Sequence, residues 1–283
     1  MASEIEASAA AARTVVDVRF RIPGRARAHD AGALELGAHD LVVVETGGGP
    51  ELGEVIREPR PLWPEERGAK LPRVLRIADE DDLRRAGHNR RQERRARAVF
   101  LEAIARLGVP AKLIRVDYRF DGGKAVFYFL AEKRIEFRSL GRELAQALHT
   151  RVEMRQIGDR DETRLVGGIG PCGRELCCSS WMRSFEAVSI KMAKAQGLSL
   201  SPSKLAGMCG RLKCCLRYEY ETYLALRREL PRVGARVQTV KGDGKVIEQI
   251  PLRGQVRVRR SEDDVVVECG LEDLVAKRPE ADG

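Results

Sequence analysis

Apolar and charged residues alternate near the start of the chain, as they do along a strand with one buried face. Val16, Val18 and Phe20 are separated by charged residues, and a period of two predicts a strand. Apolar runs at 41–44 and 52–56 flank a glycine-rich turn, which is typical of a hairpin. These patterns predict a small, strongly curved β module at the N-terminal end.

The period changes to that of a helix from about Asp79. The apolar residues within 99–107 recur at spacings of three and four, which predicts a helix with one buried stripe, and Gly108 marks its end. Alternating residues at 114–120 and an apolar run at 126–130 then predict two strands joined by a turn.

A second helix and a third strand complete this central region. Leu140, Leu144 and Leu148 share one helical face, and Val152 and Met154 alternate as in a strand. The order helix–strand–strand–helix–strand predicts a compact α+β sandwich with both helices on one face of the sheet.

A β pattern returns near the C-terminus. Apolar residues within 233–237, 245–247, 256–258 and 265–267, with a glycine turn at 241–244, predict a second small sheet. Its hairpin resembles the one in the N-terminal module, and we expect the two β modules to pack together.

The patterns therefore predict an α+β protein with a cysteine-rich region inserted before the last sheet. The expected segments are a loose N-terminus (1–15), an N-terminal β module (16–78), an α+β sandwich (79–158), a cysteine-rich region (159–230), a C-terminal β module (231–276) and a tail (277–283).

Composition places the chain among soluble globular proteins. It has 283 residues, of which 43% are hydrophobic and 33% charged, and 51 basic against 42 acidic residues give a net charge of +9. Residues 1–12 lack the basic and apolar regions of a secretory signal, and no stretch is long and apolar enough to insert in a membrane. We therefore expect a cytoplasmic protein whose thiols stay reduced, so that its cysteines serve metal or redox chemistry rather than disulfides.

Six of the seven cysteines lie in two near copies of one phrase, Cys-Gly-Arg-x-x-Cys-Cys. The copies begin at Cys172 and Cys209, and the second starts 37 positions after the first (209 − 172). Residues 174–186 and 211–229 are predicted helical, and Pro202 is predicted to open a short helix that Ser201 caps.

Four thiolates can close a tetrahedral zinc site or hold a four-iron cluster. Each phrase can offer its first cysteine and one cysteine of its adjacent pair, because neighbouring side chains point in different directions. The most natural shared set is Cys172, Cys177, Cys209 and Cys214. This leaves Cys178 and Cys215 as further candidates.

The surroundings of the cysteines suit a negatively charged group. Each Cys-Gly turn lets the backbone, with its amide groups, come close to the sulfurs. Arg174 and Arg211 stand at equal offsets in the two phrases, where they could offset the charge of a bound cluster. The four-residue spacing also occurs in plant-type ferredoxins, whereas zinc sites more often use Cys-x-x-Cys, and the same difference argues against a thiol oxidoreductase. The spacing favours an iron–sulfur cluster, with zinc and merely buried thiols as alternatives.

Other signals are weaker. Residues 168–173 satisfy G-x-G-x-x-G, but a charged run rather than a strand precedes them, so we interpret them as a lead-in to the metal site. The arginines within 84–97, and Arg253, Arg257 and Arg259, are candidate RNA contacts or solvated faces. Cys269 stands alone in a strand pattern and is interpreted as a core residue. No Ser-His-Asp or paired-carboxylate constellation emerges from the sequence, which argues against a hydrolase.

The cysteine phrases and their flanks resemble the RicT (YaaT) family of bacterial proteins with a PSP-one C-terminal homology domain. The resemblance rests on residues 160–178, on 188–194, on 198–204 and on the second cysteine phrase, and it extends from about residue 16 to about residue 274. Its implied function is that of a regulatory subunit without enzymatic activity.

The resemblance also implies partners. Family members join two small helical proteins, RicA and RicF, in a complex with four-iron clusters that promotes mRNA processing by RNase Y. By position, Cys172, Cys177, Cys209 and Cys214 would hold a cluster within this chain, and Cys178 would reach one shared with the partners. Eukaryotic relatives include RNA-binding proteins, so the alternative is a zinc-stabilised RNA-binding protein.

Overall fold

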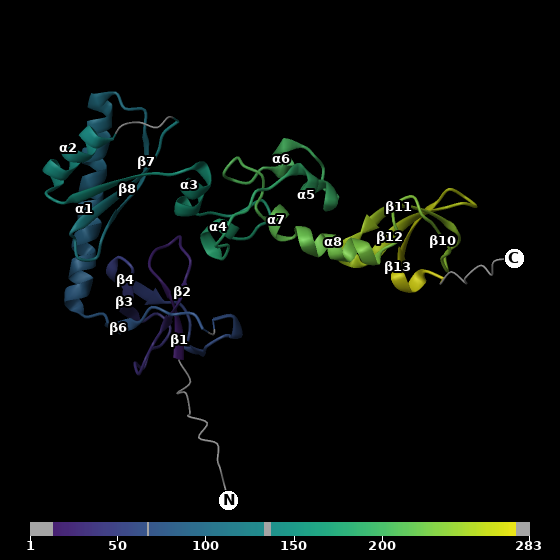
Figure 1. The fold of residues 1–283 in the computed structure, drawn as a ribbon, viewed down its shortest axis with the longest axis horizontal. Helices are drawn as coiled ribbons and strands as arrows, with labels where there is room; N and C mark the ends of the chain where they lie inside the picture. The colour runs from purple at the N-terminus through teal and green to yellow at the C-terminus, as the bar shows by residue number, and fades with distance from the viewer. Residues whose placement is uncertain (1–13, 67, 133–136, 276–283) are drawn as a thin grey trace, which may run out of the picture. The chain divides into compact units, whose positions relative to one another are not determined.

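The computed structural model describes residues 14–66, 68–132 and 137–275 and divides the chain into two compact units (Figure 1). One unit comprises Met1–Arg183 with Met208–Gly210, and the other comprises Ser184–Gly207 and Arg211–Gly283. The predicted loose N-terminus up to residue 13 and the predicted tail at 277–283 lie outside the described residues.

The first unit begins with a six-stranded antiparallel sheet in the order β2-β1-β4-β3-β6, to which β5 adds by pairing with β1. Its strands are β1 (Thr14–Arg19), β2 (Arg27–Asp30), β3 (Leu41–Thr46), β4 (Gly49–Val55), β5 (Arg60–Pro61) and β6 (Val74–Ile77). Buried valines dominate its core, as expected for β-branched residues on a pleated surface. The predicted hairpin is confirmed as β3 and β4, whereas β2, β5 and β6 were not predicted because they are short.

The central region confirms the predicted order of elements. A three-stranded mixed sheet, β7 (Lys112–Tyr118), β8 (Lys124–Leu130) and β9 (Arg151–Gln156), pairs β7 antiparallel and β9 parallel to β8. The helices α1 (Glu80–Leu107) and α2 (Arg138–Leu148) share one hydrophobic cluster with the sheet. Because alternate residues of β8 such as Ala125, Phe127 and Phe129 enter this cluster, both helices cover the same face.

Helix α1 has the predicted boundaries because its two ends are capped. Asp79 Oδ1 accepts a hydrogen bond from Asp82 N at 2.9 Å, and Asp82 Oδ2 accepts one from Asp79 N at 3.1 Å, which together form a capping box. Arg76 Nη2 also donates to Asp82 Oδ1 at 2.9 Å. Gly108 ends the helix at φ 61°, in the left-handed region that glycine adopts without strain.

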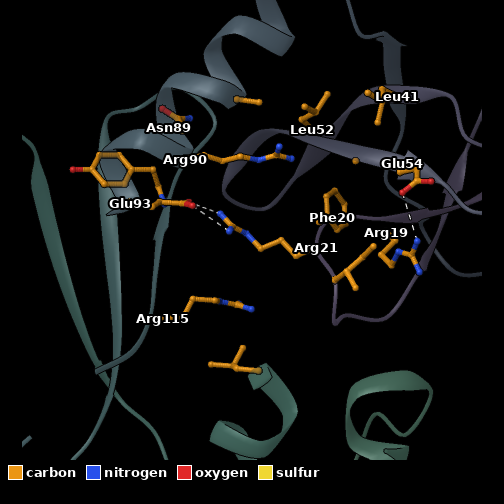
Figure 2. A pocket seen from close by; sticks show the side chains of 15 residues that line it. Arg19, Phe20, Arg21, Leu41, Leu52, Glu54, Asn89, Arg90, Glu93 and Arg115 are labelled. Carbon is orange, nitrogen blue, oxygen red and sulfur yellow. Dashed lines mark hydrogen bonds and ion pairs between the residues drawn. The ribbon is translucent and has the colours of Figure 1, made fainter. Parts of the chain in front are cut away.

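Glu93 of α1 connects three elements of the first unit. Its Oε1 accepts hydrogen bonds from Arg21 Nη2 at 2.5 Å and from Tyr118 N at 3.0 Å, and Figure 2 shows the Arg21–Glu93 pair. Arg21 follows β1 and Tyr118 ends β7, so one carboxylate fixes the N-terminal sheet, the long helix and the central sheet in place.

The cysteine-rich region contains only short helices, apart from α8. In the first unit these are α3 (Asp159–Val166) and α4 (Cys177–Ser180), and in the second α5 (Ile190–Ala195), α6 (Pro202–Leu205), α7 (Cys215–Tyr218) and α8 (Tyr220–Glu229). The predicted helix start at Pro202 with Ser201 at the N-cap position is confirmed, although the Ser201 side chain makes no capping hydrogen bond and its Oγ lies 2.9 Å from Ser203 Oγ. Across the described parts of the chain, the helices lack the combined length and apolarity required to cross a membrane.

The second unit ends in a four-stranded antiparallel sheet in the order β10-β11-β12-β13. Its strands are β10 (Arg236–Val237), β11 (Gly244–Ile250), β12 (Gln255–Arg260) and β13 (Val266–Gly270). Gln249 joins this sheet to α8, because its Nε2 donates to Pro231 O at 2.9 Å and its Oε1 accepts from Arg227 Nε at 2.8 Å. Cys269 is fully buried in the core of this sheet, as predicted. Packing of the two β modules against each other stays a prediction.

Asp82 makes the stability of α1 dependent on pH. The hydrogen bonds from the Arg76 guanidinium lower the pKa of Asp82 from 3.8 to about 2. A carboxyl whose pKa is lowered by folding stabilises the fold above its unfolded pKa, and this contribution is lost as the pH falls from about 4 to about 2. We expect Asp82→Asn to lower the free energy of unfolding by about 1–2 kcal/mol at pH 7, measured by urea denaturation followed by circular dichroism.

The matched control is Asp81→Asn, because Asp81 is exposed and pairs with Arg84, an exposed arginine one turn away. Its effect should stay within about 0.5 kcal/mol. An Asp82→Asn effect that is unchanged between pH 7 and pH 3 would contradict the assigned role of the ionised carboxylate.

Candidate metal centre

The two cysteine phrases adopt the same backbone turn. In the first, Gly170 N donates to Arg174 O at 2.8 Å, and in the second, 37 positions later, Gly207 N donates to Arg211 O at 2.8 Å. Antiparallel bridges close both turns at the same offset, pairing Ile169 with Glu175 and Ala206 with Leu212. The sequence repeat is therefore also a structural repeat.

The glycine of each phrase supplies a conformation that other residues rarely adopt. Gly173 has φ 78° and Gly210 has φ 72°, and both values lie in the left-handed region where a Cβ atom is strained. The Cys-Gly step is thus needed to reverse the chain directly after the first cysteine of each phrase.

The second and third cysteines of each phrase stand at the start of a short helix. Cys177 opens α4, whereas in the second phrase Cys214 occupies the N-cap position and Cys215 opens α7. The prediction of a helix over 174–186 is wrong except at α4, because residues 174–176 are used in the turn and Leu176 N donates to Gly168 O at 3.0 Å. The helix predicted over 211–229 begins only at Cys215, and α7 and α8 are separated by Glu219.

The six thiols differ in exposure, and all seven cysteines of the chain are outside disulfides. Cys172 is exposed, and Cys177, Cys209, Cys214 and Cys215 are half-buried. Cys178 is only 6% exposed. Cys177 is therefore the more accessible member of the first pair. The low exposure of Cys178 does not favour the reach towards partner subunits that the resemblance implies, and its role as a ligand of a shared cluster stays a prediction.

The described residues contain no preformed metal cage. Cys209 groups with the first phrase in the first unit, and Cys214 and Cys215 belong to the second unit. Among residues 14–66, 68–132 and 137–275, no three His, Cys, Asp or Glu side chains converge so as to hold a metal ion. Each phrase is thus described by itself as a turn that carries thiols.

Burial and nearby negative charge change the pKa of Cys215, the last cysteine of the second phrase. Burial, followed by the negative charges of Glu219 and of the Cys214 thiolate, raises the pKa of Cys215. The arginines at equal offsets, Arg174 and Arg211, are both exposed. They add positive charge beside the first cysteine of each turn.

The glycine pattern at 168–173 is part of the first turn. It follows α3 and leads into the four-residue α4, so it lacks the strand-to-long-helix context of a dinucleotide site. This confirms its interpretation as a lead-in to the cysteines.

The sequence reasoning missed a group of arginines beside Cys178. Arg25, Arg27 and Arg164 line a pocket together with Cys178. The Arg-x-Arg spacing directly after Pro23 and Gly24 was the available signal, but only the fold brings it next to α3 and α4.

Comparison with known protein families identifies the class of protein to which this fold and its repeated cysteine turns belong. Residues 72–157 match the PSP1 C-terminal conserved region, and residues 187–230 match the third domain of PSP1-like proteins. The first match covers β6 to β9 of the central sandwich, and the second covers α5 to α8 with the second cysteine turn.

A full-length relative makes the assignment specific. The chain is 39% identical over 261 residues to stage 0 sporulation protein YaaT of Bacillus subtilis (strain 168), which covers 92% of this chain and 95% of YaaT. The chain therefore belongs to the YaaT family of PSP1 C-terminal domain proteins, as its cysteine phrases indicated. No solved structure matches it.

The exposures predict the order in which the thiols react. In metal-free protein, iodoacetamide should modify Cys172 first and Cys178 and Cys269 last, with rates at least about tenfold apart, because burial blocks access. Cys215 should react more slowly than Cys214 near neutral pH, because its raised pKa leaves less thiolate. Peptide mass spectrometry after timed alkylation measures these rates, and equal rates for Cys172 and Cys178 would contradict the inward orientation of Cys178.

Proposed function

We propose that this protein is a non-enzymatic regulatory subunit that carries a four-iron cluster on its two cysteine turns. The observation that supports this most directly is the identical construction of the turns at residues 168–177 and 205–214. A turn of fixed shape, repeated with its cysteines in register, is expected where paired sulfur ligands are needed rather than where thiols only fill a core.

The donor set fits such a group. Cys172, Cys177, Cys209 and Cys214 are the cysteines that remain at least partly exposed at matched positions of the two turns, and none is oxidised to a disulfide. Four thiolates would hold the iron cluster, which when bound supplies reversible one-electron chemistry. Exposed Arg174 and Arg211 would offset the negative charge of the thiolates. Zinc could use the same four sulfurs, so metal analysis decides between the two.

The same family membership supports protein partners. We propose that the chain acts with RicA-like and RicF-like subunits and modulates mRNA processing by RNase Y in the cytoplasm. Cys178 was predicted to ligate a cluster shared with these subunits. The thiol of Cys178 is buried and lines a pocket. A cluster shared with the partners would therefore have to enter that pocket, or α4 would have to rotate to expose the thiol.

The cluster can be tested by anaerobic purification. The protein should be brown and contain about four iron and four sulfide per chain, and Cys172→Ser, Cys177→Ser, Cys209→Ser and Cys214→Ser should each lose most of the iron. Iron and sulfide analysis with a visible spectrum measures this. Cys269→Ser is the control, because Cys269 lies in the core of the C-terminal sheet, and it should retain its iron. A colourless protein with one tightly held zinc would contradict the proposed iron–sulfur cluster.

A second candidate function is direct RNA contact by α1. Its seven arginines between positions 84 and 97 are all exposed, and Arg90, Arg94 and Arg97 share one helical face at spacings of four and three. In the C-terminal sheet, by contrast, Arg257 is held by both Glu248 and Glu268. Among the described residues, Arg94 and Arg97 of α1 form no ion pair, which makes α1 the better candidate for phosphate contacts.

We expect the full-length protein to bind single-stranded RNA with an affinity that falls steeply with salt. Arg94→Gln/Arg97→Gln should weaken binding and lower the salt slope by about 0.7 for each lost phosphate contact, whereas Arg257→Gln should change neither. Fluorescence anisotropy over a series of salt concentrations provides the measurement. If the two variants behave alike, α1 is not the RNA-binding face.

A further inference from the structure

The first unit contains an arginine-lined pocket that the proposed cluster does not use. Its volume is about 470 Å³, within the range of small-ligand sites. Arg25 and Arg27 enter it from the loop after β1 and from β2, Arg115 and Arg155 from the central sheet, and Arg164 from α3. It adjoins the pocket drawn in Figure 2, with which it shares Arg21 and Arg115.

The charges around this pocket do not balance. Its lining has six arginines and three carboxylates. Asp117 is held by Arg115 at 2.9 Å and Arg21 at 3.3 Å, and Asp161 pairs with Arg164 at 3.0 Å. Arg155 pairs with Glu153 outside the pocket. Burial raises the pKa of the remaining carboxyl, Glu51, which weakens its opposition to an anion.

Arg25 is where the excess positive charge concentrates. Its Nη1 donates to the carbonyl of Met182 at 3.0 Å, and within the described residues no carboxylate forms an ion pair with Arg25 or Arg27. Burial and then the repulsion of Arg164, Arg27 and Arg183 lower the pKa of Arg25. Four guanidinium groups that repel one another remain together at a cost, which a bound anion would relieve.

We propose that this pocket binds a small phosphate-bearing ligand, with Arg25, Arg27 and Arg164 as its phosphate-binding groups. Guanidinium groups recognise phosphate through paired hydrogen bonds, which favours phosphate over a monovalent anion. The remaining volume, beside Tyr128, accommodates a group of about the size of a nucleoside. Cys178 and Ser179 line the same pocket, so the ligand would lie against the start of α4.

The test is isothermal titration calorimetry of the full chain at low salt with inorganic phosphate, pyrophosphate and adenosine monophosphate. At least one of these probes should bind saturably with one site per chain. Arg25→Gln and Arg27→Gln should each weaken that binding by about tenfold. Arg151→Gln is the matched control, because Arg151 is an exposed arginine of β9 outside both pockets, and this variant should bind the probe as the unchanged protein does.

Three results would overturn the proposal. One is the absence of saturable binding by all three probes, and another is unchanged binding by Arg25→Gln and Arg27→Gln, both of which can be verified as folded by circular dichroism. The third is displacement of the bound probe by an RNA with a 5′-hydroxyl end at equal or higher affinity, which would make the pocket part of an RNA surface. None of these outcomes bears on the iron content, so this proposal and the cluster proposal fail separately.

Discussion

The first unit depends on a network of ion pairs centred on Arg21. This network joins the N-terminal sheet to the central sandwich. Arg21 reaches Glu93 of α1 at 2.5 Å and Asp117 of β7 at 3.3 Å, and Glu93 also accepts from the backbone of Tyr118. A carboxylate that is removed from water without such partners would be strongly destabilising. The loop after β1 is therefore held beside the central sheet, and this loop carries Arg25 of the proposed phosphate pocket and leads into β2, which begins at Arg27.

This constraint explains why the arginine pocket and the first cysteine turn are neighbours. Asn89, buried on α1, donates to the carbonyls of Arg119 and Phe120 at 3.0 and 3.1 Å, so the helix is fixed to the turn between β7 and β8. From this frame β9 leads directly through α3 into the turn at residues 168–177. Helix α4 then places Cys178 against the arginines and leaves Cys172 and Cys177 accessible. The two adjacent thiols of one pair consequently face different chemical environments.

The second cysteine turn repeats the backbone of the first but not its surroundings. It is followed by α7 and α8, and a small cluster of Ala193, Leu205 and Leu216 supports it. The final sheet is joined to α8 by Gln249, whose side-chain amide bonds to backbone and side-chain groups at residues 227–231. Duplication of the phrase thus provides two equivalent thiol-bearing turns, each supported by a different core.

The sequence by itself determined the features that depend on local chemistry and periodicity. These include the central order of helices and strands, the start of α1 near Asp79, its end at Gly108, the two Cys-Gly turns and the family. The tertiary structure alone decided which member of a cysteine pair is buried. It also restricted the helix within 174–186 to α4 and brought Arg25 and Arg27 beside Arg164. Periodicity reports which face of one element is apolar, but the burial of Cys178 and the grouping of distant arginines depend on long-range packing, which no local pattern encodes.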